Sequence, residues 1–280
     1  MKLIAFSQRD LAGKNIAKIL VEKFGFEETN KEFDGYPVYK RGDIQVIGCK
    51  EDTIQLDYLN KFACPEICVI ASRHKSASGK ETLTCHSTGN FGAAEAGGND
   101  RELAIAPAVY LREALLSMQK EKENGGLKEY DVTLEVTHHG PTNLPFPVLF
   151  IEVGSSKEQW SDQGACEAVA NSIYGILSSG VKEDKVVIGF GGPHYAPNFT
   201  KLLSKSFRKS FIKNISVGHI APKYAVDTID KNLIKQMISK TTPKPEFAVL
   251  DWKGLKWEHR ERVIGILNEL GFEWKKISDI

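Results

Sequence analysis

The chain alternates between short, almost continuous apolar runs and segments whose apolar residues recur at helical spacing. Each run is short enough for a strand, and polar residues or glycine follow it. Strands that are apolar on both faces are typical of a sheet covered on both sides. The pattern predicts an α/β fold of three layers, α/β/α, around a mixed, largely parallel sheet. The expected strands are KLIAFS (2–7), DIQVIGC (43–49), ICVIAS (67–72), DVTLEVT (131–137), VLFIEV (148–153), VVIGFG (186–191), ISVGH (215–219) and FAVLDW (247–252).

Helical patterns fill the segments between these runs and carry signals at their ends. Ser7 with Asp10 resembles a capping box, Ser155 with Glu158 repeats it, and Pro107 suits a first helical turn. The stretch 73–100 is rich in Ser, Thr, Gly and Asn and shows little periodicity, so we expect a loop there. The expected helices run from Ser7 to Gly25 and over 107–122, 155–178, 199–212, 228–239 and 257–270.

Composition narrows the class of protein without identifying it. The chain has 280 residues, 41% of them hydrophobic and 26% charged, and a net charge of +1, so no overall charge marks a nucleic-acid binder. No apolar run approaches the roughly 18 residues of a membrane span, and the first run is too short for a secretory signal. Five irregularly spaced cysteines favour a reducing compartment. We expect a single cytoplasmic domain over 1–280, with a minor hinge near 241–245.

Histidines recur where the expected strands end. In open α/β sheets ligands bind beyond the carboxyl ends of the strands, so we expect these imidazoles to meet at one edge of the sheet, near two carboxylates. Imidazole suits proton transfer and metal binding near neutral pH, and the arrangement therefore indicates an enzyme. His259, in the charged segment WEHRERVIG, is expected to be a solvated surface residue. The residues expected at the edge are His74, His138, His139, His194, His219, Glu135 and Glu152.

Common catalytic motifs are missing, but a set of less common ones resembles a known family. The chain has no G-x-S-x-G elbow, HExxH or P-loop, and a serine nucleophile among Ser72, Ser76 and Ser87 has only weak support. The segments SRHKSASG, LTCHSTGNFG, EVTHHGPT, IEVGSS, GGPHYAPNF and GHIAPKY together resemble the archaeal and plant type of D-aminoacyl-tRNA deacylase. The resemblance runs from the first strand to the last helix. It implies hydrolysis of the ester between a D-amino acid and the 3′ adenosine of tRNA, a fold related to phosphorylases and peptidyl-tRNA hydrolases, and dependence on zinc.

The residue types fit that chemistry in two ways. Hydrolysis of an ester needs an activated water and a group that stabilises the oxyanion, and zinc with an open coordination position supplies both. Without metal, one histidine would act as general base, and the backbone N–H of Gly140, Gly154 or Gly192 would face the oxyanion. The sequence leaves both open. The catalytic candidates are His138, His139, Glu135 and His194, and the candidate zinc ligands are His74, His138, His139, His194 and Glu152.

The implied substrate is D-aminoacyl-tRNA, bound by its acceptor stem and 3′ adenosine, and no membrane or obligate protein partner is expected. Lys201, Lys205, Arg208 and Lys209 would form a basic helix face against the stem. Phe91, Tyr195 or Phe199 would stack on the terminal adenine. A zinc peptidase or amidohydrolase of the same fold and a non-catalytic RNA-binding module stay as alternatives. The substrate-binding candidates are Arg73, His74, Lys75, Asn90, Thr142, Asn143, Tyr195, His219 and Lys223, with Lys80 beside them.

Overall fold

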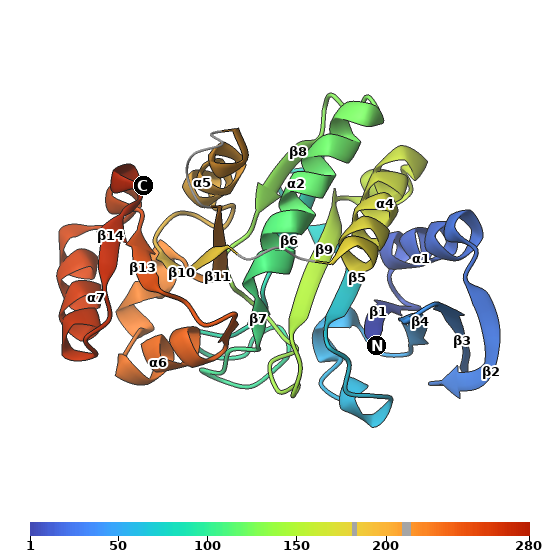
Figure 1. The fold of residues 1–280 in the computed structure, drawn as a ribbon, viewed down its shortest axis with the longest axis horizontal. Coiled ribbons are helices and arrows are strands. Elements are labelled where there is room, and N and C mark those ends of the chain that lie inside the picture. Colours follow the sequence, from blue (N-terminus) through green and yellow to red (C-terminus); the bar gives the residue numbers. More distant parts are fainter. Residues whose placement is uncertain (181–183, 209–213) are drawn as a thin grey trace.

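The computed structural model describes residues 1–180, 184–208 and 214–280 of the chain, and the side chains of 205–208 are also outside the description. Its described strands form two larger sheets, which lie side by side along the long axis of the molecule (Figure 1). The first sheet has eight strands in the order β2-β3-β4-β1-β5-β9-β6-β8. These strands are β1 (Lys2–Ser7), β2 (Glu27–Phe33), β3 (Tyr36–Arg41), β4 (Ile44–Cys49), β5 (Cys68–Lys75), β6 (Thr82–His86), β8 (Asp131–Leu134) and β9 (Val148–Ser155).

Most neighbouring strands of this sheet are parallel, as the apolar runs predict. The pairs β1·β4, β1·β5, β5·β9 and β6·β8 are parallel, while β2·β3, β3·β4 and β6·β9 are antiparallel. Because side chains alternate across a strand, Ile4 packs on one face of the sheet while Leu3 and Ala5 pack on the other. The predicted α/β fold with a large, mixed, mostly parallel sheet is confirmed.

The two faces of the first sheet are covered differently. One face packs against α1 (Leu11–Phe24), α2 (Ala108–Asn124) and α4 (Gln163–Ser179), and the short helix α3 (Lys157–Trp160) precedes α4. The opposite face packs against Leu56, Leu59, Leu144 and Phe146. Two of these residues lie in or beside the 3-10 turns η1 (Thr53–Gln55) and η2 (Leu59–Lys61). Short turns and loops thus replace α-helices over that face, and they leave room at its edge for a site.

The second sheet is parallel throughout its described strands and has the order β11-β10-β13-β14. Helices α2 and α5 pack against β11, and apolar residues of α6 and α7 cover the opposite face. A two-stranded pair, β7 with β12, lies between the two sheets (Figure 1). The elements are β7 (Ala106–Pro107), β10 (Lys185–Phe190), α5 (Pro197–Arg208), β11 (Ile215–Ala221), η3 (Lys223–Thr228), α6 (Lys231–Ser239), β12 (Thr241–Thr242), β13 (Phe247–Leu250), η4 (Trp252–Gly254), α7 (Trp257–Glu269), β14 (Trp274–Lys276) and η5 (Ile277–Asp279).

The predicted helix caps are wrong by a few residues. The N-cap of α1 is Asp10, whose side chain accepts a hydrogen bond from the Gly13 N–H, and Ser7 belongs to β1. The capping box before α3 joins Ser156 to Gln159 instead of Ser155 to Glu158. Asp and Ser are both good caps, so local geometry decided between neighbouring candidates.

Two further expectations are wrong. The stretch 73–100 is not only a loop, because β6 crosses it and pairs with β8 and β9. His259 is 8% exposed instead of solvated, and its Nε2 lies 3.2 Å from Oδ1 of Asp227 in η3. The helix predicted at 199–212 ends at Arg208 as described, and the side chains of Lys205 and Arg208 and the whole of Lys209 lie outside the described residues. In the described part of the chain, no helix is long and apolar enough to cross a membrane.

Candidate active site

The candidate active site lies on the face of the first sheet that α-helices do not cover. Glu152 in β9 pairs in register with Ser72 of β5 on one side and with Thr84 of β6 on the other. Residues opposite one another across strands project to the same face, so His74 and His86, two residues further along β5 and β6, join Glu152 there. Phe150 precedes them on the same face, and its ring stacks on His86 with centroids 5.2 Å apart. The Glu152 carboxylate therefore follows apolar side chains of β9 on this face of the sheet.

Gly154 makes room for His74 across the strand pair. A Cβ at position 154 would lie 2.8 Å from both Cβ and Cδ2 of His74. Such a contact is too short for any side chain, so glycine is required if the imidazole is to lie over β9.

The remaining groups come from the junction between the two sheets. After β8 the chain continues beside the loop that follows β10, where Val136 N–H donates to His194 O and Ala196 N–H donates to Leu134 O. The same segment reaches β11, because Thr137 N–H donates to Ile220 O. This pairing brings Glu135 and His138 from one sheet against His194 from the other.

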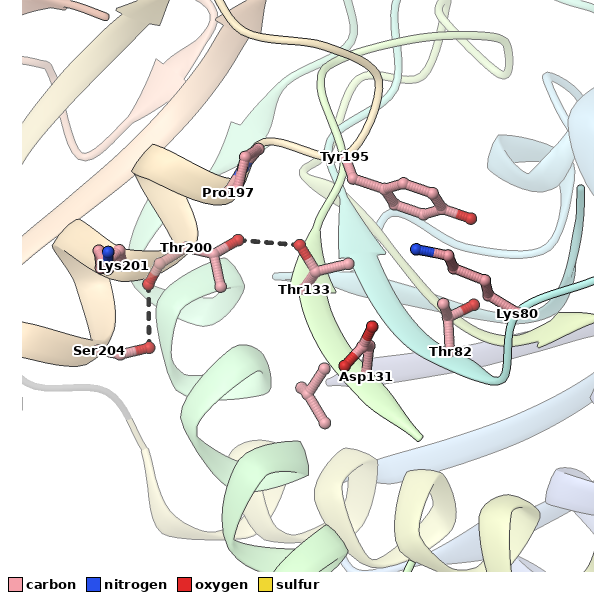
Figure 2. Close-up of a pocket in the computed structure, with 10 residues that line it drawn as sticks. Lys80, Thr82, Asp131, Thr133, Tyr195, Pro197, Thr200, Lys201 and Ser204 are labelled. Atoms are coloured by element: carbon pink, nitrogen blue, oxygen red, sulfur yellow. Dashed lines mark hydrogen bonds between the residues drawn. The ribbon is translucent and has the colours of Figure 1, made fainter. Parts of the chain in front are cut away.

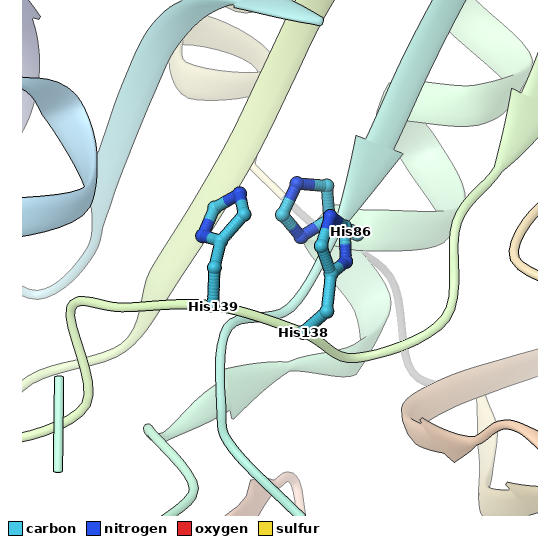
Figure 3. Close-up of side chains that lie close together, drawn as sticks. All are labelled: His86, His138 and His139. Atoms are coloured by element: carbon cyan, nitrogen blue, oxygen red, sulfur yellow. The ribbon is translucent and has the colours of Figure 1, made fainter. Parts of the chain in front are cut away.

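Glu135 lies at the centre of the cluster. Its carboxylate is fully buried, with His74 Nδ1 3.0 Å from Oε1, and with His194 Nε2 2.9 Å and His138 Nε2 3.3 Å from Oε2. Glu152 forms a second centre, 3.5 Å from His74 Nδ1 and 3.7 Å from His86 Nε2. His86, His138 and His139 converge at the end of β6, with ring centroids 4.2 to 4.8 Å apart (Figure 3).

Backbone carbonyl groups fix the orientation of three of the imidazoles. His138 Nδ1 lies 2.8 Å from Val136 O, His139 Nδ1 lies 2.7 Å from Gly140 O, and His86 Nδ1 lies 3.2 Å from Ser87 O. A carbonyl only accepts, so Nδ1 carries the proton and Nε2 keeps a free lone pair in each neutral ring. This orientation is the usual one for histidines that bind a metal.

Close packing shifts the pKa values of the cluster in opposite directions. Burial would raise the pKa of Glu135 and Glu152, but the neighbouring imidazoles hold Glu135 well below its usual range and Glu152 at about 2. Burial would lower the pKa of His74, yet the two carboxylates raise it to about 11. Burial and neighbouring imidazoles lower the pKa of His139 to about 4 and hold that of His138 well below its usual value. The paired histidines are therefore neutral at neutral pH.

The cluster fits a metal ion. His86 Nε2 is buried and has no hydrogen-bond partner in the described structure, and the buried carboxylate of Glu135 faces three imidazole nitrogens within 3.3 Å. Unpartnered buried acceptors are costly, and a cation would satisfy them. Three sets of ligand atoms lie within 4.8 Å of one another: His86, His138 and His139; His74, Glu135 and His194; and His86, Glu135 and Glu152.

Comparison with known proteins identifies the family. The family model described as D-aminoacyl-tRNA deacylase matches residues 62–275. This chain belongs to the D-aminoacyl-tRNA deacylase family. The D-aminoacyl-tRNA deacylases of Pyrococcus furiosus and Thermococcus onnurineus are each 40% identical to it over 282 residues, covering 99% and 98% of this chain and 100% and 99% of theirs. A crystal structure of a conserved protein of unknown function matches with a TM-score of 0.88 and 28% identity, over 100% of this chain and 96% of that one.

Most of the residues expected at the sheet edge do meet in this deacylase fold, and one important residue was missed. His74, His138, His139, His194, Glu135 and Glu152 are brought together, while His86 was not predicted because its segment reads as a loop. Its position in LTCHSTGNFG, within a motif of the family, was the available signal. His219 lies outside the cluster, with Nδ1 3.2 Å from Thr137 Oγ1 and Nε2 3.1 Å from Ala104 O.

The remaining predicted substrate-binding residues divide into three groups. Tyr195 joins the cluster, since its hydroxyl lies 2.9 Å from His74 Nε2. Lys75 and Lys223 are exposed, and Arg73 reaches Asp52 at 3.4 Å and stacks over Trp160. The others stabilise loops: Asn90 donates to Gly97 O and Asn99 O, Thr142 donates to Glu102, and the Asn143 N–H donates to Asp57.

Three other sequence expectations change with the structure. Phe91 and Phe199 are buried in the two cores, so they are not available for stacking on a base. The Gly140 N–H donates to Ala96 O and is therefore not free to face an oxyanion.

Proposed function

We propose that the protein hydrolyses the ester bond of D-aminoacyl-tRNA, releasing the free D-amino acid and tRNA and protecting translation from D-amino acids. The observation that carries the proposal is the fully buried carboxylate of Glu135 held among the imidazoles of His74, His138 and His194, in a chain of the D-aminoacyl-tRNA deacylase family. Because the reaction belongs to translation, we assign the protein to the cytoplasm.

The proposed cofactor is zinc. Imidazole and carboxylate groups are ordinary zinc ligands, and catalytic sites combine three of them with an open position. His74, Glu135 and His194, or His86, His138 and His139, would hold the ion, and Glu152 would orient His74 and His86. When bound, zinc lowers the pKa of a water ligand and polarises a carbonyl group.

The protein's own groups would orient the substrate and move protons. His138 and His139 are neutral at neutral pH, with Nδ1 bound to a carbonyl. With the ion held by His74, Glu135 and His194, their Nε2 atoms would be available to accept a proton from water. The Tyr195 hydroxyl, held by His74 Nε2, would donate a hydrogen bond to the oxygen of the ester. The partly exposed side chain of His194 forms the open side of the cluster, where the 3′ end of a tRNA would enter.

The test compares purified protein on D-Tyr-tRNA and L-Tyr-tRNA, with and without chelator, by loss of the aminoacyl ester. We expect the D-ester to be released far faster and chelator to slow the reaction. Equal rates on both enantiomers would contradict the proposal. Cleavage of peptides without ester release would favour a peptidase, and tRNA binding without turnover would favour an RNA-binding module.

A further inference from the structure

A cavity of about 560 Å³ lies beside the histidine and carboxylate cluster, between the last two strands of the first sheet and the start of α5. Lys80, Thr82 and Tyr195 lie on one side of it, and Lys201 and Ser204 of α5 lie on the other (Figure 2). Its volume is in the range of roughly 300–1,000 Å³ that small-molecule sites have. The cavity is therefore large enough for a nucleotide.

Tyr195 connects this cavity to the site proposed above. Its ring is half-buried and lines the cavity, while its hydroxyl lies 2.9 Å from Nε2 of His74 in the cluster. A substrate whose ester lies at the cluster would thus extend along Tyr195 into the cavity. Since Phe91 and Phe199 are buried, Tyr195 is the one of the three predicted aromatic residues whose ring can contact a base.

Three groups of the cavity lining, Lys80, Lys201 and Thr82, have no side-chain partner among the described residues. The lining also includes Asp131 and the hydroxyl groups of Thr133, Thr200 and Ser204, which hydrogen-bond within the protein. Lys80 and Lys201 are exposed, and in the described chain neither ammonium lies within ion-pair distance of a carboxylate. Thr82 is 2% exposed, and its Oγ1 has no hydrogen-bond partner among the described residues. Two free cations and one aromatic ring match a phosphate and a base.

We propose that this cavity binds the 3′-terminal nucleotide of the tRNA, with its base on Tyr195 and its phosphate facing Lys80 and Lys201. The assignment rests on the proposed function, because the ester at the cluster is attached to that nucleotide. An amino-acid side chain is the other part of the substrate near the ester. It offers no constant negative charge for the two lysines, so the nucleotide fits the cavity better.

AMP serves as the probe of the cavity, with adenosine as the comparison that lacks the phosphate. We expect AMP to inhibit deacylation competitively and more strongly than adenosine. Lys80→Glu and Lys201→Glu should each weaken AMP inhibition and raise KM for D-Tyr-tRNA by at least about tenfold, the scale of one lost charge-assisted contact, with kcat little changed. Lys253→Glu removes an equally exposed lysine on η4, away from the cavity, and should leave both constants unchanged.

A bulky substitution in the cavity tests whether it binds the terminal nucleotide or the amino-acid side chain of the substrate. Val132 lines the cavity and is half-buried, and Val132→Trp should raise KM for D-Tyr-tRNA and D-Ala-tRNA by the same factor, because both end in the same nucleotide. A rise for D-Tyr-tRNA alone would overturn the inference in favour of an amino-acid pocket. Unchanged AMP inhibition and KM in both lysine variants, which alter exposed side chains and leave the fold intact, would also overturn it.

The experiments can contradict the deacylase function and the nucleotide site independently of each other. If wild-type protein released D-esters normally while the lysine variants matched Lys253→Glu, the deacylase function would stand and the nucleotide site would be wrong. If wild-type protein released no ester but bound AMP, by calorimetry, in a manner that depended on Lys80 and Lys201, the nucleotide site would stand without the deacylase function.

Discussion

Nε2 of His138 lies 3.3 Å from Oε2 of Glu135, while Nδ1 of the same ring lies 2.8 Å from the carbonyl oxygen of Val136. The carbonyl requires the proton on Nδ1, so Nε2 and the carboxylate meet as two acceptors. His194 Nε2 lies 2.9 Å from that same oxygen. A shared cation or proton would stabilise the close approach of His138 Nε2 and the Glu135 carboxylate, and this is the physical basis for proposing the ion and the chemistry at Glu135.

Glu135→Gln tests the central carboxylate. The amide has nearly the same shape but no charge, so we expect zinc retained after dialysis to fall and turnover to drop by at least about 100-fold. Metal content is measured by atomic spectroscopy and turnover by ester loss. Glu261→Gln, on the exposed side of α7, is the matched control and should retain both. Full zinc content and normal turnover in Glu135→Gln would show that the carboxylate only stabilises the fold.

The roles of His138 and His139 are tested by substitutions that are compatible with the backbone conformation at each position. His139 has a φ of 45°, a conformation that asparagine tolerates better than most residues, so His139→Asn removes the imidazole without adding strain. We expect His138→Ala and His139→Asn each to lower turnover by at least about 100-fold, with the Tm of the metal-free protein little changed because the pair lies in a loop. Turnover near that of the wild type would assign the pair a structural role.

Sequence patterns predicted the elements that are buried on both faces. Strands such as β5 and β9 are continuous apolar runs because residues on both sides of them are covered, and this property is visible in any window of the sequence. β6, with the sequence TLTCH, was missed because its threonines look like loop residues, although all five residues are buried by pairing with β8 and β9. β2 was missed for the opposite reason: EETNKEF is almost entirely exposed, and antiparallel pairing with β3 defines it.

The candidate site was predictable in part for the same reasons. Strand ends carry His74, Glu135 and His194 in the sequence, and parallel strands bring such ends together. What the sequence could not provide was the order of the strands, which places β6 next to β9 and thereby adds His86 to Glu152. Nor could it separate His219 from the cluster, because the partners of that ring are a threonine and a carbonyl group distant in sequence.

His86 and chelation test the metal directly. Removing zinc with chelator should lower the Tm as well as the turnover, because a ligand that binds only the folded state stabilises it. Added zinc should restore both. His86→Gln, which removes the ring that was not predicted from sequence, should retain less zinc and show a smaller chelator-induced shift in Tm. An unchanged Tm on chelation of fully loaded wild-type protein would contradict a metal bound by these buried groups.

His219 makes a prediction about stability and pH, independent of catalysis. Burial lowers its pKa to about 4, against an ordinary value of 6.5, so the folded state holds the ring neutral while the unfolded chain binds a proton below about pH 6.5. The stabilisation is therefore complete above pH 6.5 and is lost as pH falls towards 4, by about 3 kcal/mol over this window.

His219→Gln keeps a polar side chain between Thr137 and Ala104 but cannot be protonated. We expect the free energy of unfolding, measured in urea from pH 4 to 8, to fall less steeply with decreasing pH in the variant than in the wild type. The difference between the two slopes should correspond to at most one proton taken up on unfolding. The other histidines contribute equally to the pH dependence of both proteins, so the difference between the two curves reports His219 alone. Parallel curves would contradict the prediction, because they would mean that folding does not lower the pKa of His219.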